Sequence, residues 1–477
     1  MRRPMRRAYA GNYLDLGMSP PVPLPTNVEV TRFLSEAALA DLGGVPVTES
    51  TPEGDERIAR MMAAEAVAAL NRREGRSSAG WYTSSIRSAL SVAGLMFPEL
   101  ESDDDAATLG RGFEGAADAR CIFFLCLAIT SQNNTVQENV RYALEQYRHF
   151  KDHGALMPKV YGQKGASIAM NLRRANDMLD VFGGSVAKLR DFLDTTFTMR
   201  DVRDAAAAHG IRVGGRELSD EPVKGSMIFG PKIGNGFYQN LVGNHANVTF
   251  DLWWMRSWGR YTGTLLKGQV TPAQVERLSA SLAAASREDR DMLGRAGVDL
   301  EADHAAMAPD ELVAACRPLA PAWEGMRKRM VERGMGNPEI SALKAEMGWP
   351  GAAEAVMKGL ARSVDQPENA GDRRWMRSVV GRALDMLAVR GYRMSAADLQ
   401  ATLWYPERSL YAALSGRKAD HANVSFEEAL SDAALKEGHD DESVWRARGH
   451  AGRVPPVLGD DGPGGRGGDG PAPGGFH

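Results

Sequence analysis

The chain has 477 residues, more than one hydrophobic core usually serves, so two or three domains are expected. Apolar residues make up 43% and charged residues 25%, which is typical of a globular protein, and the net charge of −4 does not by itself suggest a nucleic-acid or membrane partner. Three cysteines without a Cys-x-x-Cys pair argue against a disulfide framework, a zinc site or an iron–sulfur cluster. No stretch approaches the roughly 20 apolar residues of a membrane span, and no apolar segment follows the basic N-terminus, so we expect a cytoplasmic protein.

In chain order, residues 1–54 are rich in turn residues, as in "SPPVPLP", and predict an irregular segment. Residues 55–112 are predicted to be helical, because apolar side chains recur at helical spacing in "DERIARMMAAEAVAALNRR". A second amphipathic helix is predicted in "TVQENVRYALEQYRHFKDHG", ending at Gly154. Cys121 and Cys126 lie in an apolar, helix-like run and are expected to be buried free thiols.

The second half of the chain also favours helices. Thr271-Pro272, Asn337-Pro338 and "SAAD" at 395–398 are typical helix starts. The aromatic-bearing helices predicted at 81–100 and 398–417 are expected to belong to the core. We therefore predict an all-α fold in which residues 263–438 pack on the core and the Gly/Pro-rich residues 439–477 form a disordered tail.

Charge is distributed unevenly along the chain. Residues 141–270 hold 18 Lys and Arg against 12 Asp and Glu, a net charge of +6, which leaves −10 for the remainder. This basic middle is compatible with a surface that faces phosphates, and equally with chance unevenness on solvated helices.

Three short stretches of the middle region carry the polar residues of interest. In "AITSQNNTVQENV" (128–140) a cluster of amides separates two predicted helices. "MIFGPKIGNGFYQNLVG" (227–243) predicts a helix–turn–helix junction centred on Gly230-Pro231, with Lys232 just inside the second helix. In "NVTFDLWWMRSWGR" (247–260), Asp251 follows a β-branched and aromatic run and immediately precedes a predicted helix. Asp251 comes 19 residues after Lys232.

Together these stretches resemble the helix-hairpin-helix DNA glycosylase superfamily. "IFGPKIG" is similar to the hairpin with its lysine, "VTFD" to the run that ends in the catalytic aspartate, and "TSQNN" to the loop whose amide fills the gap left by a flipped nucleotide. The resemblance covers residues 115–262 and implies a two-lobed helical fold, with 113–262 as its glycosylase-like core. Two positions depart from the family pattern, since Ile228 replaces the first hairpin glycine and Trp253 replaces a histidine often found two places after the aspartate.

The resemblance implies a role for each charged group. Asp251 would stabilise the positive charge that develops on the sugar when the glycosidic bond breaks, and a helix N-cap would keep this carboxylate fixed and ionised. Lys232 matches the lysine that attacks C1′ in members that also nick the strand. Alternatively, Asp251 is only a cap and Lys232 is a solvated or phosphate-binding side chain.

The remaining candidates are contacts to DNA. Gln132, Asn133 and Asn134 are expected to contact the orphan base or, as the alternative, to form a capping turn. The hairpin residues Ile228, Gly230 and Gly234, the helix face formed by Trp253, Arg256 and Arg260, and the upstream residues Lys164 and Arg173 are expected to meet the base or the phosphates. Trp254, Trp258 and Tyr261 have the spacing of a core-facing stripe.

These residues predict a monomeric DNA glycosylase that flips a damaged base, or a hypermodified phage base such as glucosylated hydroxymethylcytosine, out of double-stranded DNA. Neither a metal nor an organic cofactor is expected. Two other classes remain open. A non-catalytic helix-hairpin-helix DNA-binding protein would keep the hairpin without the chemistry, and a helical protein-interaction module would place Asp251 and Lys232 far apart.

Overall fold

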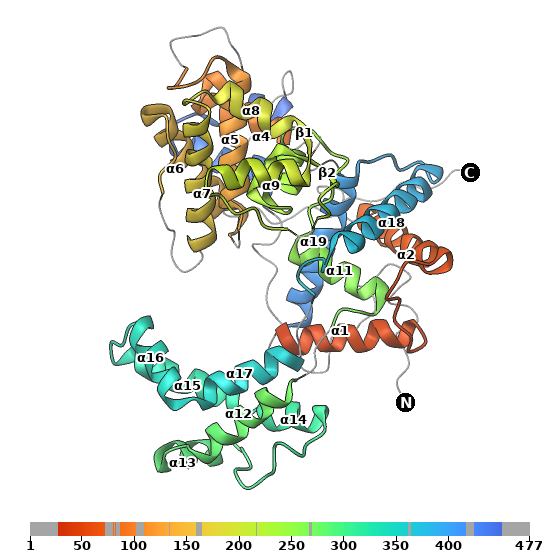
Figure 1. Cartoon of the computed structure of the whole chain (residues 1–477), viewed down its shortest axis with the longest axis vertical. Coiled ribbons are helices and arrows are strands. Elements are labelled where there is room, and N and C mark those ends of the chain that lie inside the picture. Colours follow the sequence, from red (N-terminus) through yellow and green to blue (C-terminus); the bar gives the residue numbers. More distant parts are fainter. Residues whose placement is uncertain are drawn as a thin grey trace, which may run out of the picture.

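The computed structural model describes residues 27–71, 80, 82, 86–101, 109–132, 134–158, 165–215, 217–266, 270–360, 364–415 and 424–450. The described chain is mostly helical, which confirms the predicted all-α class at that level (Figure 1). In its first half the helices are α1 (Asn27–Asp41), α2 (Pro52–Leu70), α4 (Ile86–Met96), η3 (Pro98–Leu100), α5 (Ala116–Thr130), α6 (Val136–His153), α7 (Gly165–Val181), α8 (Val186–Asp194), α9 (Met199–Ala208), η5 (Gly225–Phe229), η6 (Ile233–Tyr238) and α10 (Gln239–Leu241). The second half contains α11 (Leu252–Thr262), α12 (Pro272–Ala283), α13 (Arg287–Arg295), α14 (Pro309–Cys316), α15 (Leu319–Glu332), α16 (Asn337–Met347), α17 (Trp349–Leu360), α18 (Ala370–Val389), α19 (Ala396–Leu414), α20 (Phe426–Lys436), α21 (Asp441–Trp445) and η7 (Arg446–His450).

The two strands of the described chain are three residues each. β1 (Thr196–Thr198) pairs antiparallel with β2 (Pro222–Lys224), with Phe197 opposite Val223. This short ribbon leads directly into η5, so it fixes where the turn around Gly230 begins.

Helix starts follow the capping residues. Thr135, Thr271 and Ser395 each accept a hydrogen bond from the backbone N–H three residues on, and α6 ends at Gly154 in the left-handed conformation (φ 73°). At Asn337-Pro338 a helix also begins, but Asn337 is not its N-cap as predicted: the N-cap is Gly336, Asn337 is the first helical residue and Pro338 the second.

Both ends of the chain are more helical than expected. Residues 27–41, predicted as irregular, form α1, because Val30, Leu34 and Ala38 recur on one face and are buried. Residues 441–450, predicted as the start of the tail, form α21 and η7, and Val444 is buried. The rest of the predicted tail, 451–477, lies outside the described residues.

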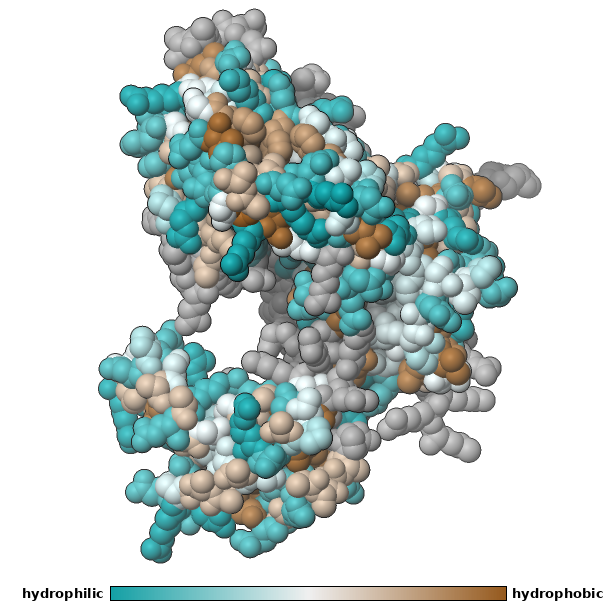
Figure 2. All heavy atoms as spheres, in the orientation of Figure 1, coloured by the Kyte–Doolittle hydropathy of each residue, from teal (hydrophilic) through white to brown (hydrophobic). Residues whose placement is uncertain are grey.

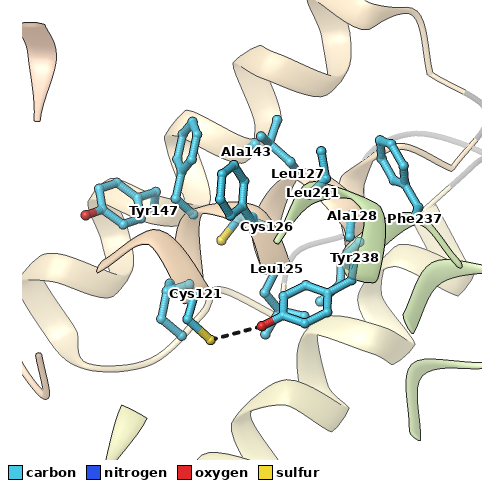
Figure 3. Close-up of a cluster of buried hydrophobic side chains, with 14 of the residues drawn as sticks. Cys121, Leu125, Cys126, Leu127, Ala128, Ala143, Tyr147, Phe237, Tyr238 and Leu241 are labelled. Atoms are coloured by element: carbon cyan, nitrogen blue, oxygen red, sulfur yellow. Dashed lines mark hydrogen bonds between the residues drawn. The ribbon is translucent and has the colours of Figure 1, made fainter. Parts of the chain in front are cut away.

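The largest hydrophobic cluster joins α4–α10 with α20 and α21, a group that we call the hairpin lobe. α5 runs through its centre, with every side chain from Cys121 to Thr130 buried. Cys121 and Cys126 are free and buried, as predicted. Figure 3 shows the Cys121 sulfur beside the Tyr238 hydroxyl, 3.3 Å away, and burial raises the pKa of the Cys121 thiol to about 12. These thiols are therefore unreactive core groups.

A second cluster packs α2, α11, α18 and α19, and we call this group the α11 lobe. α19 crosses between the two lobes: Ala397, Ala401 and Tyr405 belong to the core of the hairpin lobe, and Leu399 and Leu403 to that of the α11 lobe. Further along α19, Leu410 and Leu414 pack with α1. α19 is therefore the wall that the two lobes share.

The helices α12–α17 form a third group with a core of their own, centred on the fully buried Trp349. Figure 1 shows them as a separate set of helices. The region predicted as one unit packing on the core, 263–438, is thus divided: α12–α17 have their own core, whereas α18–α20 complete the two lobes. On the face drawn in Figure 2, apolar residues are scattered among polar ones over all three groups.

Candidate active site

Asp251 stands at the start of α11, at the end of a buried segment without regular secondary structure. Val248, Thr249 and Phe250 are each at most 6% exposed, so this segment is anchored in the core. Oδ1 of Asp251 accepts a hydrogen bond from the backbone N–H of Trp254 (2.7 Å), which makes Asp251 the N-cap of the helix. The carboxylate is therefore held in one position by the helix that it caps.

The hairpin is tighter than the sequence predicted. A 3-10 helix, η5, leads to Gly230 (φ +90°), and a π-helical turn, η6, follows; Lys232 precedes η6 instead of lying inside an α-helix. Gly234 lies so close to the preceding turn that a Cβ there would be 1.6 Å from the carbonyl oxygen of Ser226. Only a glycine permits this approach.

Asp251 and Lys232 line the same cavity, which has a volume of about 120 Å³. Its wall comes from six regions: Tyr82 before α4, the amide loop with α6, the hairpin, the segment before α11, α19, and α20. Besides the two charged groups, it includes Tyr82, Ser131, Asn134, Thr135, Val136, Asn139, Ile233, Phe237, Thr249, Gln400, Ala401, Trp404 and Phe426. The cavity combines aromatic faces with amide groups, a composition that suits a flat, polar ring.

The charge on Asp251 is set by opposing effects. Burial raises the pKa of the Asp251 carboxyl above its usual value, whereas the positive charge of Lys232, the N–H groups of Trp254 and Trp253, and Arg408 act to lower it. Arg408 lies over the ring of Trp404 (4.8 Å), and burial lowers the pKa of its guanidinium. Asp251 is thus a partly desolvated carboxylate between two cations, an arrangement that is typical of functional sites.

A second and larger cavity, of about 910 Å³, adjoins the first, and Lys232 and Ile233 line both. It runs between α7 and the hairpin on one side and residues 364–368 with Arg373 on the other. Three further cationic side chains, Arg174, Arg212 and Arg373, line it together with the acidic Asp365 and Glu368. The small cavity therefore adjoins a larger one whose wall carries both cationic and acidic side chains.

The amide loop contributes to both cavities. Gln132 lines the large one, where its Nε2 donates to the carbonyl of Ile129 (3.0 Å) and its Oε1 accepts from Ser167. Asn134 lines the small one and donates to the carbonyl of Thr130 (2.8 Å). Asn133, the third predicted amide, lies outside the described residues.

The predicted binding face of α11 is not an open surface. Arg260 is fully buried and bonded to Glu407 (2.6 Å) and Glu65 (2.8 Å), so it cannot meet a phosphate. Arg256 is 7% exposed and stacks on Trp253 (4.4 Å), which itself packs edge-on against a tyrosine of α19. The predicted core stripe of α11 is confirmed, because its three members Trp254, Trp258 and Tyr261 are buried.

Other predicted contacts are only partly available. The side chain of Ile228 is buried at 1% exposure and its carbonyl accepts from Arg174 (2.8 Å), so neither group faces solvent. Gly230 lines the large cavity, whereas Gly234 is buried. Arg173 is exposed, and Lys164 lies outside the described residues.

Several pocket residues were missed because they lie on α19, which the sequence assigned to the core. Gln400, Trp404 and Arg408 repeat at i, i+4 and i+8 along this helix; Gln400 and Trp404 line the small cavity, and the charge of Arg408 acts on Asp251. The polar Gln400 and Arg408 within an otherwise apolar stripe were the signal that could have indicated a site.

Within the described residues, no three His, Cys, Asp or Glu side chains come together in a way that could hold a metal ion. None of the helices in the described part of the chain is both long and apolar enough to cross a bilayer. Compared with family models, curated proteins and solved structures, the chain matches none of them.

Proposed function

We propose that this protein is a DNA glycosylase that accepts a flipped base in the small cavity and cleaves its N-glycosidic bond. The observation that carries the proposal is the shared cavity of Asp251 and Lys232, which come from different lobes and from segments 19 residues apart. A carboxylate and an amine beside one ring-sized cavity are the groups that this reaction needs.

Asp251 would act on the sugar. As the glycosidic bond lengthens, positive charge develops on C1′, and a fixed carboxylate stabilises it without having to reorient. Burial raises the pKa of Asp251, and the N-cap bond from Trp254 and the neighbouring cations oppose this by stabilising its charged form. A water molecule, or Lys232, then forms the new bond to C1′ while the base leaves with the electron pair of the old bond.

Lys232 has two possible roles in this proposal. Its side chain is exposed and lines both cavities, so it can reach a sugar placed between them. If its amine attacks C1′, the product is an imine to the sugar and the enzyme also cleaves the strand. If water attacks, Lys232 contacts a phosphate and the enzyme only releases the base.

The dimensions of the cavities support this reading. A volume of about 120 Å³ is slightly below the roughly 150 Å³ of a cavity that holds benzene, so a single six-membered ring is the unit it accommodates. The adjoining groove of about 910 Å³, where the exposed side chains of Lys232 and Arg212 can meet phosphates, would take the strand that carries the base. A damaged single-ring base fits this volume, whereas a glucosylated base would have to extend its sugar into the adjoining groove.

Base release from a panel of damaged and phage-modified duplex DNAs, measured by mass spectrometry, tests the proposal. Wild type should release one base, and Asp251→Asn should reduce that rate by about 10²–10³-fold or more while leaving DNA binding nearly unchanged. Wild-type rates in the variant would refute the mechanism. Release of no base from any DNA would instead favour a non-catalytic DNA-binding protein.

The role of Lys232 is tested separately. Sodium borohydride should trap a covalent adduct between the wild-type protein and an abasic strand, and Lys232→Met should form none. If wild type also gives no adduct, water is the nucleophile and the enzyme is monofunctional.

A further inference from the structure

Gln400 of α19 has an amide half that the fold leaves without a partner. The side chain is 4% exposed and lines the small cavity. Its Oε1 accepts a hydrogen bond from the backbone N–H of Thr249 (3.3 Å). Because a backbone N–H can only donate, the oxygen must be the atom that faces Thr249, and this fixes which way the amide is turned.

The NH₂ group of Gln400 is therefore the part of the amide that remains available as a hydrogen-bond donor. Its nitrogen makes no hydrogen bond among the described residues, and the atom keeps some surface accessible to solvent. Since nearly all of the side chain is buried and it lines the cavity, this donor opens into the cavity. A buried amide in a purely structural role normally has both ends satisfied inside the protein.

The position of Gln400 is reinforced from behind. Thr249, which it binds, also accepts a hydrogen bond at its hydroxyl from Asn240 (3.2 Å), and Asn240 is fully buried. Thr249 lies two residues before Asp251 on the same anchored segment. The donor of Gln400 and the carboxylate of Asp251 are thus held in a fixed relation by one stretch of backbone.

Asn134 supplies the complementary group. Its Nδ2 donates to the carbonyl of Thr130 (2.8 Å), and a carbonyl can only accept, so the Oδ1 of Asn134 is the free end. Asn134 lines the same cavity and is partly exposed. The cavity wall therefore holds one oriented donor, from α19, and one oriented acceptor, from the amide loop.

We propose that Gln400 is the specificity-determining residue of this cavity, donating its N–H to a carbonyl oxygen or ring nitrogen on the edge of a six-membered-ring base. This inference rests on the base pocket of the proposed function. It adds which edge of the base the protein recognises by a hydrogen bond. A base is selected because any ring that presents a C–H or another donor toward α19 leaves the Gln400 donor buried and unpaired.

A pair of free rings of nearly equal shape tests the inference without requiring catalysis. 5-Fluorouracil carries carbonyl acceptors, whereas 2,4-difluorotoluene does not, and both can be followed by ligand-observed ¹⁹F NMR titration. Relative to difluorotoluene, fluorouracil should bind about fivefold more weakly to Gln400→Leu than to wild type, because one neutral hydrogen bond is lost.

Gln400→Glu at pH 8 is the second variant. Its carboxylate can still accept from Thr249 and so preserves the local structure, but it presents an oxygen where wild type presents a donor. The uracil preference should fall at least as far as in Gln400→Leu.

An unchanged ratio in either folded variant, or the absence of saturable binding of both rings to wild type, would overturn the role of Gln400. The proposed function is decided independently by base release from DNA. A wild-type enzyme that releases base and whose Gln400 variants keep their ring preference would refute only this inference.

Discussion

The two ends of α11 carry charged clusters of opposite character. At its N-terminus, Asp251 lines the same cavity as Lys232, together with the amide groups of Asn134 and Gln400. In its last turn, Arg260 is enclosed by Glu407 and Glu65, with no exposed surface of its own. Both clusters join α11 to α19, and the sequence predicts a function for both, catalysis for Asp251 and DNA binding for Arg260.

The difference lies in what surrounds the charges. Arg260 has its carboxylate partners inside the protein, so its charge is used to hold α2, α11 and α19 together. Asp251 receives a cap bond and the influence of two cations, yet its pKa is still raised by burial, so its environment does not favour the charged form. A charge held against such an unfavourable environment indicates function more than one that is fully paired.

The largest effect on stability is expected at the enclosed end. Arg260→Met should lower the free energy of unfolding by about 3–5 kcal/mol, because it leaves the carboxylate of Glu407 buried without its cation. Chemical denaturation measures this loss.

The matched control is the double variant Arg260→Met, Glu407→Met. It removes both charges and should recover much of the lost stability. If the single variant loses less than about 1 kcal/mol of unfolding free energy, the ion pairs of Arg260 do not stabilise the packing of α11 on α19.

A smaller effect is expected at the hairpin. Gly234→Ala should cost about 1–3 kcal/mol, since the new Cβ would meet the Ser226 carbonyl at 1.6 Å and force the hairpin away from Asp251. The rate of base release should also fall in this variant.

Gly381→Ala in α18 serves as its control. No atom lies within 4 Å of the Cβ position at Gly381, so alanine should stabilise the helix by about 0.5–1 kcal/mol. Equal effects of the two substitutions in thermal unfolding would mean that the close approach at Gly234 is not required.

The smallest effect on the free energy of unfolding is expected for Asp251→Asn, which should leave it unchanged or increase it near pH 7. Because its pKa is raised on folding, its contribution to stability is present at low pH and is lost as the pH rises through the folded-state pKa. Asp251→Asn keeps the N-cap and removes the buried charge, so it should melt at or above the wild-type temperature near pH 7. The two proteins should converge at low pH.

The rate of base release should depend on the protonation of Asp251. It should decline as the pH falls through the raised pKa of Asp251, because the protonated carboxyl cannot stabilise a cation. A melting temperature of Asp251→Asn well below wild type at pH 7 would mean that the carboxylate is a structural group like Arg260.

Much of the local structure could be predicted from the sequence. The caps at Thr135, Thr271 and Ser395 and the stop at Gly154 are set by hydrogen bonds within a few residues, so they need no tertiary information. The position of Asp251 as an N-cap is of the same kind. Its functional role remains a proposal.

The arginines of α11 could not be assigned in this way. A charged residue at helical spacing is as consistent with a solvated face as with a buried pair, and the partner of Arg260 is 147 residues away on α19. The third group of helices was missed for a related reason, since periodicity marks an apolar face without saying which core it enters.

The amino-acid sequence by itself determined where helices start and stop, which stripe of α11 is apolar, and that a carboxylate caps this helix after an anchored run. Tertiary structure alone decided that Lys232 and Gln400 share a cavity with that carboxylate, and that Arg260 is instead buried in an ion pair with Glu407. Caps and periodicity depend on neighbours within one or two turns. Cavities and ion pairs depend on which distant surfaces exclude water together, and the packing of α19 between two lobes establishes that here.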